Sequence, residues 1–285
     1  MAGEIGESTV ARLTRAEMEA AAIEGRQVAG RLDKSTALRL LREGELTVVG
    51  RLLTASNATF FAIVTGRGSD PARTIVAGAG EDPATAVMAS CVYKPTRGER
   101  PLYDFPDGTL ACREVAAHAV SEASGWEIVP PTVMRDGPFG EGMVQLWVEV
   151  DESVDIAEMV SSDNPALRRV AVLDVVLNNA DRKGGHLLPL PDGRIQGIDN
   201  GLCFAVAPKL RTVLWRWRGQ SLTDDERVVL SDLREQLTGV LREQLRPLLT
   251  PDEVAAMAGR IDDLLEGGLL PRPGRDRPAI PWPPY

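Results

Sequence analysis

Within residues 176–204, VLNNADRKGGHLLPLPDGRIQGIDNGLCF, the types and positions of Asp181, His186 and Asp199 are those of residues that bind a metal ion or accept a proton. Asp181 precedes an arginine, Asp199 opens the turn-forming triplet Asp-Asn-Gly, and His186 lies between them. The chain has only 2 histidines, so the position of this one is informative. Carboxylate oxygens and a neutral imidazole are ligands for divalent cations, so the spacing indicates metal-assisted chemistry.

Phosphoryl transfer from ATP fits this pattern. The reaction needs a lysine that holds phosphates, carboxylates that hold the metal, and an aspartate that orients the acceptor hydroxyl. In kinase catalytic loops the fifth residue after that aspartate is an asparagine metal ligand, and an Asp-x-Gly aspartate lies farther on. Asp181 suits the first role and Asp199 the last, with His186 in the place of the asparagine. Because imidazole beside carboxylate oxygen suits Mn²⁺ better than Mg²⁺, we expect ATP with Mn²⁺ or Mg²⁺.

Simpler roles are open for all three residues. His186 could cap a turn or bond a backbone carbonyl, and the two aspartates could be turn residues. The helical pattern before Asp181 and the strand-like RIQGI before Asp199 favour the catalytic interpretation. If His186 is a ligand it must be unprotonated, so metal binding should weaken as the pH falls through about 6.5.

Lysine is rare in this chain, because arginine supplies most of the positive charge. The lysines are Lys34, Lys94, Lys183 and Lys209. Lys94 ends the β-branched stretch CVYKP, where the phosphate-binding lysine of a kinase would lie. Glu114 on the next helical segment could pair with Lys94 and fix its ammonium group, with Glu122 as the competing partner. Alternatively, Lys94 is a solvated charge at the end of a strand, and Glu114 and Glu122 lie on a solvated helix face.

The turn TASNATF supplies a second candidate contact for phosphates. Ser56 or Thr59 could lay hydroxyls and backbone amides over the phosphates of a nucleotide. Taken alone the segment is a hairpin turn, and it lacks a GxGxxG pattern.

The elements that must position these residues change character along the chain. In the first half we expect helices at residues 14–43 and 109–125, with a capping box at 14–17. We expect strands at residues 45–53, 60–66, 85–95 and 142–150.

The second half of the chain is mostly helical. Asn164 and Pro165 form a good helix start, and capping boxes at 223–226 and 250–253 open two further helices. Residues 271–285 hold six prolines and read as an extended tail. We therefore expect an α+β protein of two lobes with a cleft between them: residues 1–149, 150–270 and then the tail.

Composition narrows the function classes. With 44% apolar and 26% charged residues, a chain of 285 residues can bury a large core. The net charge of −9 argues against nucleic acid and stable membrane association as partners. No apolar signal core or membrane-length run is present, so we expect a cytoplasmic protein. Its 3 cysteines lack CxxC spacing and indicate buried thiols.

Five blocks of the sequence, taken in order, resemble the phosphatidylinositol 3-/4-kinase-like superfamily. Within it they are most similar to the type II phosphatidylinositol 4-kinases and to short actinobacterial proteins assigned to that superfamily. The blocks lie between about Leu52 and Phe204: VYKP, REVAAHAVSEASGWEIVPPT, MVQLWVE, NADR and IDNGLCF.

This resemblance implies a two-lobed, protein-kinase-like fold, with a strand-rich N-lobe, a mostly helical C-lobe and ATP in the cleft. Lys94 would hold the phosphates and Glu114 would orient it. Asp181 would be the catalytic aspartate and Asp199 a metal ligand. His186 departs from the family's asparagine. The adenine-binding hinge would be formed by the backbone of Gln145, Leu146, Trp147 and Val148.

The segment 207–220, APKLRTVLWRWRGQ, combines arginines with two tryptophans. Such a stretch could meet a phosphorylated substrate, a nucleic acid or a membrane surface. We expect instead an amphipathic helix with its tryptophans in the core, and no cysteine-rich acylation motif accompanies it.

Three functions compete on these residues. The first is an ATP-dependent phosphotransferase acting on a protein hydroxyl, its own included, or on a small molecule. The second is a pseudokinase that binds nucleotide and regulates a partner. This hypothesis is motivated by His186, which stands where kinases have an asparagine. The third is a metal-dependent phosphohydrolase using Asp181, His186 and Asp199 as a metal cluster, which leaves Lys94 without a role.

Overall fold

The computed structural model describes residues 12–13, 32–52, 57–67, 86–274 and 277–285, which form two compact units. The first contains the described residues up to Ala111 together with Pro131–Trp147. The second contains Cys112–Pro130 and Val148–Tyr285. The division expected from the sequence ran unbroken to residue 149, whereas here residues 112–130 belong to the second unit.

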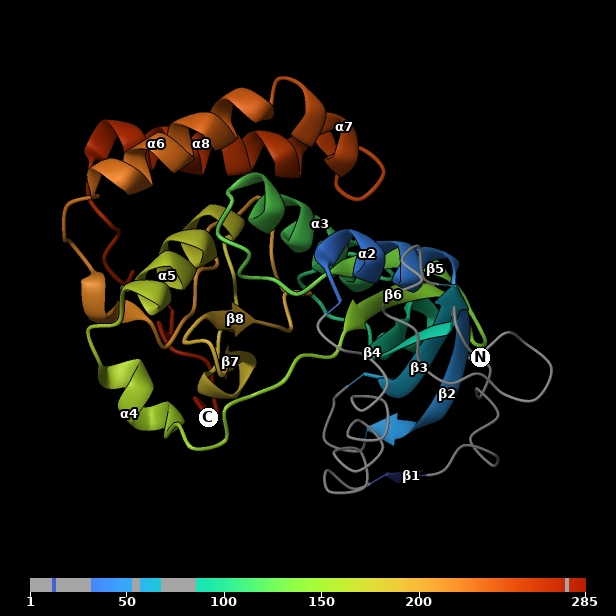
Figure 1. The fold of residues 1–285 in the computed structure, drawn as a ribbon. Coiled ribbons are helices and arrows are strands. Elements are labelled where there is room, and N and C mark those ends of the chain that lie inside the picture. Colours follow the sequence, from blue (N-terminus) through green and yellow to red (C-terminus); the bar gives the residue numbers. More distant parts are fainter. Residues whose placement is uncertain (1–11, 14–31, 53–56, 68–85, 275–276) are drawn as a thin grey trace. The chain divides into compact units, whose positions relative to one another are not determined.

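The first unit is built on one sheet with the strand order β1-β2-β3-β4-β6-β5 (Figure 1). Its longer strands pair antiparallel, and the two-residue β1 adds to β2 in parallel. The strands are β1 (Arg12–Leu13), β2 (Glu45–Leu52), β3 (Phe60–Arg67), β4 (Ala86–Pro95), β5 (Thr132–Gly137) and β6 (Gly140–Leu146).

Helix α2 (Lys34–Glu43) packs its apolar face against this sheet (Figure 1). Asp33 caps the helix by accepting a hydrogen bond from the Thr36 amide at 3.0 Å. Leu40 and Leu41 join β-strand residues in the core, among them Val64. Burial of such side chains stabilises the unit by roughly 1.5–3 kcal/mol each.

The second unit is mostly helical, with one small hairpin. Its helices are α3 (Leu110–Ala123, of which the first two residues belong to the first unit), α4 (Ile156–Ser161), α5 (Pro165–Leu177), α6 (Asp224–Gln236), α7 (Val240–Leu245) and α8 (Pro251–Gly267). The hairpin consists of β7 (Leu187–Pro189) and β8 (Ile195–Gly197). The expected combination of a strand-rich part with a helical part is thus confirmed.

Helix α5 lies in the core of the second unit. The side chain of Asn164 accepts a hydrogen bond from the Ala166 amide, and Pro165 occupies the first turn, as the sequence predicts. Buried leucines and valines cover much of its surface, and Asp174 is buried among them with no exposed area. A charged side chain that deep requires partners.

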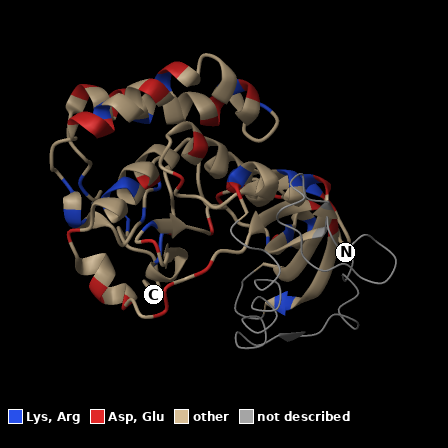
Figure 2. Cartoon of the chain, viewed as in Figure 1, with Lys and Arg blue, Asp and Glu red and all other residues tan. Residues whose placement is uncertain are grey.

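Capping boxes begin α6 and α8, again as predicted. Thr223 and Glu226 bond each other's backbone amides at the start of α6, and Thr250 and Glu253 do the same for α8. Both helices carry acidic and basic residues along their length (Figure 2), while their apolar residues join the core.

Several expectations differ from the structure. The strand expected at 142–150 ends at Leu146, and the helix expected at 207–220 is absent: only the 3₁₀ turn η5 (Trp215–Trp217) forms there. Of the two tryptophans expected in the core, Trp217 is buried and Trp215 is half-buried; Arg216 and Arg218 are exposed, as expected. The capping box at 14–17 lies outside the described residues. The sequence pattern did not predict the short strands β5 and β7. It also did not predict the helices α4 and α7, each of which has only six residues.

Among the described residues, none of the helices combines the length and apolar character needed to cross a bilayer. The three cysteines are unpaired thiols: Cys91 and Cys203 are buried, and Cys112 is half-buried.

Candidate functional site

The loop after α5 carries Asp181. Asn178 ends the helix in the left-handed conformation, with φ 54°, and its side-chain amide donates to the carbonyls of Ala205 and Ala207 at 2.8 Å each. Its side-chain oxygen accepts from the Lys209 amide at 2.8 Å. One asparagine therefore stops α5 and fixes the segment that follows Asp199.

A buried ion pair lies beneath this loop. The Arg182 Nε lies 3.1 Å from Asp174 Oδ1 and 3.3 Å from Oδ2, and neither residue has any exposed area. Thr212 donates its hydroxyl to the same carboxylate at 3.2 Å, and the Asn179 amide donates at 3.1 Å. These bonds compensate the desolvation of both charges.

Arg182 also reaches the residues on both sides of Asp199. Its NH1 donates to the Ile198 carbonyl at 2.7 Å, and its NH2 donates to Asn200 Oδ1 at 2.6 Å. Gly197 leaves room for the guanidinium, since a Cβ there would lie 3.2 Å from Arg182 NH2. A single arginine therefore connects the loop of Asp181 with the turn of Asp199.

Asp199 itself has φ 59°, a left-handed backbone that is uncommon outside glycine and more accessible to Asp and Asn. The next amide, that of Asn200, donates to the carboxylate of Glu114 at 2.8 Å. Glu114 is buried on α3. Together with Arg182 it holds the strained turn in place, which is how such conformations persist.

His186 faces Asp199. Its Nε2 lies 3.3 Å from Asp199 Oδ2, and its Nδ1 lies 3.5 Å from the Lys183 amide. Burial lowers the pKa of His186, an effect that the nearby Asp199 carboxylate opposes. Burial therefore favours the neutral imidazole, which is the form that can act as a metal ligand.

Asp181 is flanked by cations. Lys183 Nζ lies 3.1 Å from its Oδ2 and Arg211 NH2 lies 3.9 Å from its Oδ1. The Asp181 amide donates to Asn179 Oδ1 at 2.9 Å, which fixes the backbone. The carboxylate is 19% exposed, so it is accessible to a small group from solvent.

The donor set at Asp199 fits a divalent cation in part. A separation of 3.3 Å between an imidazole nitrogen and a carboxylate oxygen suits two neighbouring ligands of one ion. Within the described residues, no group of three or more His, Cys, Asp or Glu side chains is placed to hold a metal. The three-residue cluster of Asp181, His186 and Asp199 that a phosphohydrolase would need is therefore not formed. Water and phosphate oxygens would have to complete the shell, as they commonly do for Mg²⁺.

The phosphate-binding candidates belong to the first unit. Lys94 lies near the end of β4, opposite Met143 of β6, and is half-buried. Thr59 is buried, and its hydroxyl donates to the Asn57 carbonyl at 3.3 Å. Ser56 lies outside the described residues.

The expected adenine hinge follows β6. The Leu146 amide donates to the Pro131 carbonyl at 2.8 Å, and the Trp147 amide donates to the Ser90 carbonyl at 2.9 Å. The side chain of Gln145 donates to Thr132 Oγ1 at 2.9 Å. With these donors engaged, adenine recognition here would use backbone carbonyls or the amide of Val148.

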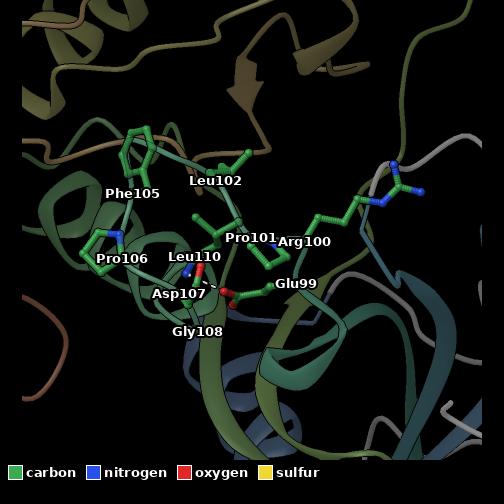
Figure 3. Close-up of a pocket in the computed structure, with 9 residues that line it drawn as sticks. All are labelled: Glu99, Arg100, Pro101, Leu102, Phe105, Pro106, Asp107, Gly108 and Leu110. Carbon is green, nitrogen blue, oxygen red and sulfur yellow. Dashed lines mark hydrogen bonds between the residues drawn. The ribbon is translucent and has the colours of Figure 1, made fainter. Parts of the chain in front are cut away.

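A small hollow in the first unit is lined by none of these candidates (Figure 3). Its lining residues belong to the segment from Glu99 to Leu110, and Glu99 accepts the Leu110 and Ala111 amides at 3.0 and 2.8 Å. Its volume is about 100 Å³, below the roughly 300–1,000 Å³ of small-molecule sites. We assign it a structural role, in which Glu99 caps α3.

Sequence reasoning missed several residues of this site. Asp174 and Arg182 were not given roles, although an aspartate within the apolar stripe of α5 is a signal for a buried partner. Arg211 was considered only as part of the basic stretch 207–220. Lys183 was noted only for its rarity. Glu114 was expected to orient Lys94, and the structure shows a further contact, to Asn200.

Comparisons with known proteins bear on this site. No family model matches the chain. It is 30% identical over 116 residues to phosphatidylinositol 4-kinase gamma 4 of rice (Oryza sativa subsp. japonica), a match that covers 34% of this chain and 20% of that protein.

Two solved structures are similar in part. Hydra Fam20 with sugar gives a TM-score of 0.47 at 15% identity, covering 90% of this chain and 95% of that chain. The Helicobacter pylori proinflammatory kinase CtkA gives 0.42 at 11% identity, covering 80% and 94%. A likeness at this level does not establish a shared fold.

A bacterial relative matches almost throughout. Protein Rv2133c of Mycobacterium tuberculosis is 40% identical over 281 residues, covering 86% of this chain and 94% of that protein. The chain therefore belongs to the family of Protein Rv2133c.

Proposed function

We propose that this protein is an ATP-dependent phosphotransferase of two-lobed, kinase-like architecture. It would transfer the γ-phosphate of ATP to a hydroxyl of a protein, itself included, or of a small molecule. The observation that carries the proposal is Arg182, which ties the loop of Asp181 to the turn of Asp199. The partial match to a rice phosphatidylinositol 4-kinase supports the reaction class.

Asp181 is assigned the role of receiving the acceptor. Its carboxylate would accept the hydrogen bond of the incoming hydroxyl and take up its proton during transfer. Asn179 fixes its backbone, and the cations Lys183 and Arg211 lie beside its two carboxylate oxygens and would orient them. In such reactions positioning and electrostatic stabilisation supply most of the rate enhancement.

Asp199 and His186 are assigned to the divalent cation, which would neutralise the negative charge of the phosphates. Coordination through His186 Nε2 requires the ring proton on Nδ1, so the long contact from the Lys183 amide would have to open. Glu114 and Arg182 would keep the Asp199 carboxylate in position from either side of the turn.

Residues of the first unit are assigned to ATP. Lys94 would bind the phosphates. Glu114 would orient the Lys94 ammonium group, as a second role besides its bond with the Asn200 amide. Thr59 and Ser56 would also contact the phosphates. Adenine would bind at residues 145–148. These assignments come from the resemblance of the sequence to the phosphatidylinositol 3-/4-kinase-like superfamily.

ATP consumption by the full-length protein, measured with Mg²⁺ and with Mn²⁺, tests the proposal. Asp199→Ala should abolish metal-dependent turnover, since it removes the carboxylate assigned to the metal. Asp192→Ala, in an exposed turn with Arg194, serves as the matched control and should retain turnover. Radiolabelled phosphate transfer by Asp199→Ala at the wild-type rate would refute the assignment.

A nucleotide-binding pseudokinase is the second candidate. It is favoured by the position of His186 Nδ1, which faces the Lys183 amide. If Nδ1 accepts this hydrogen bond, the ring proton lies on Nε2, and Nε2 then cannot coordinate a metal ion. Calorimetric binding of ATP without turnover under either metal would select this function over the first.

A further inference from the structure

The two cations at Asp181 lie on opposite sides of its carboxylate. Lys183 Nζ is 3.1 Å from one oxygen, and Arg211 NH2 is 3.9 Å from the other. A hydroxyl group bonded to Asp181 would therefore stand between an ammonium and a guanidinium.

Arg211 is held in this place by the loop itself. Its Nε donates to the Ala180 carbonyl at 2.7 Å, its amide donates to the Asn179 carbonyl at 2.9 Å, and its carbonyl accepts from the Arg182 amide at 3.0 Å. The two backbone bonds fix the main chain at Arg211, and the bond from Nε restricts its side chain. This restriction reduces the conformational entropy that the side chain loses when it binds a ligand.

The guanidinium retains donors for such a ligand. Of its five N–H groups, one is engaged with Ala180, and the side chain is 36% exposed. Lys183 is 24% exposed, and its three ammonium protons exceed what one contact with Asp181 requires. Two cations thus lie beside the single carboxylate of Asp181, in a chain whose net charge is −9.

We propose that Lys183 and Arg211 form an anion-binding pair that selects an acceptor carrying a phosphate or carboxylate close to its hydroxyl. The proposal rests on the proposed function, in which Asp181 receives that hydroxyl. Guanidinium and ammonium groups recognise phosphate through charge-assisted hydrogen bonds, with Arg offering paired donors and Lys a point charge. If the cations served only to neutralise Asp181, charged and neutral acceptors would bind alike.

Binding of matched small alcohols tests the pair. Isothermal titration calorimetry on the full-length protein compares glycerol 3-phosphate with glycerol at low ionic strength. We expect glycerol 3-phosphate to bind at least tenfold more tightly, and we expect Arg211→Gln and Lys183→Gln each to reduce that preference severalfold. Arg211→Lys should keep much of it, because the charge remains although the bond to Ala180 is lost.

The control is Arg218→Gln, an exposed arginine of the same segment whose NH1 bonds the Trp215 carbonyl. It should leave the preference unchanged. Repeating the titration with saturating ADP, and with a non-hydrolysable ATP analogue that also fills the γ-phosphate position, separates two kinds of site. An acceptor site still binds glycerol 3-phosphate with either nucleotide present, whereas a nucleotide-phosphate site is blocked. Circular dichroism of each variant identifies any loss of folding.

Three results would overturn the proposal: equal binding of glycerol 3-phosphate and glycerol, an anion preference that either nucleotide abolishes, or a preference that the folded Arg211→Gln and Lys183→Gln variants retain. The proposed function fails differently, through absence of metal-dependent ATP turnover in the wild-type protein. The two failures are thus read from separate measurements.

Discussion

At the scale of single residues, Arg182 organises the candidate site. It neutralises Asp174, bonds the Ile198 carbonyl and holds the side chain of Asn200. Removing one partner of such a buried pair leaves the other charge uncompensated, at a typical cost of about 3–5 kcal/mol. The arrangement therefore makes the geometry of Asp199 depend on the integrity of the helix that carries Asp174.

The metal preference tests the role of His186. In His186→Asn an amide oxygen replaces the imidazole, so the ratio of ATP turnover with Mn²⁺ to that with Mg²⁺ should fall by roughly tenfold. The matched control is His118→Asn, which alters the other histidine, a buried residue on α3 facing the Val129 carbonyl. That variant should keep the wild-type ratio. An unchanged ratio in His186→Asn would mean that His186 acts only as a hydrogen-bond donor to Asp199.

At this scale the sequence predicted Asp181, His186 and Asp199 as one group, and the structure of the second unit brings Asp199 and His186 within 3.3 Å. Residue type and spacing indicated these residues because all three lie within one short segment, but the three do not form a single cluster, and their roles stay predictions. Glu114 was predicted only as the residue that orients Lys94, and Arg211 only as part of the basic stretch 207–220. Their contacts with Asn200 and Asp181 could not be predicted, since these residues come from distant segments and approach only through tertiary packing. A rare lysine next to Asp181 was visible, but its contact with the carboxylate was not.

At the scale of elements, the proline-rich tail is part of the second unit near the site (Figure 1). The Ala279 carbonyl accepts from the Thr212 amide and from Trp215 Nε1, and the Pro284 carbonyl accepts from the Gly184 amide at 2.8 Å. The tail thus joins two segments that flank Asp181. Composition indicated an extended tail, but it contains no pattern that specifies where such a tail binds.

Gly184 tests this contact. A Cβ at Gly184 would lie 2.2 Å from Tyr285 Cδ1, so Gly184→Ala must displace the ring and loosen the tail. We expect faster amide hydrogen exchange of residues 277–285 in that variant. Gly185→Ala is the matched control, because a Cβ there would meet no heavy atom within 4 Å. In a Tyr285→Ala background the Gly184 substitution should add little; equal exchange in the two single glycine variants would contradict the contact.

Helices α5 and α6 are joined by a pair with a clear pH signature. Arg168 donates to Glu226 at 2.7 and 2.9 Å. Burial raises the pKa of Glu226, but the hydrogen bonds from Arg168 and Thr223 outweigh it and hold the pKa below its ordinary value of 4.5. A carboxylate with a depressed pKa stabilises the fold above its unfolded value, and the contribution is lost as the pH falls through the folded value.

Glu226→Gln should therefore lower the free energy of unfolding by about 1–3 kcal/mol at pH 7. The difference from wild type should persist down to about pH 5 and shrink below it, as seen in urea unfolding at each pH. Glu243→Gln, whose pair with Arg246 is exposed, should change stability by less than about 0.5 kcal/mol. A difference for Glu226→Gln that is independent of pH would exclude a role for its charge.

At the scale of the whole molecule, the sequence predicted a strand-rich part followed by a helical part, because strand alternation and helix caps are local signals. It did not predict that residues 112–130 belong with the helical unit, since that depends on packing between distant segments. The amphipathic helix expected at 207–220 was wrong for a related reason: its residues are held in an irregular path by bonds to the loop of Asp181, such as that from Arg211 to Ala180.

The central proposal is that Lys94 of the first unit and Asp199 of the second bind the same nucleotide together with its metal ion. An ATP analogue with a lysine-reactive acyl group on its terminal phosphate tests it directly, because only Lys34, Lys94, Lys183 and Lys209 can react and mass spectrometry distinguishes them. The account predicts metal-dependent labelling of Lys94 that excess ATP suppresses and that Asp199→Ala greatly reduces. Absence of labelling at Lys94, or labelling that neither ATP nor the Asp199→Ala substitution alters, would contradict it.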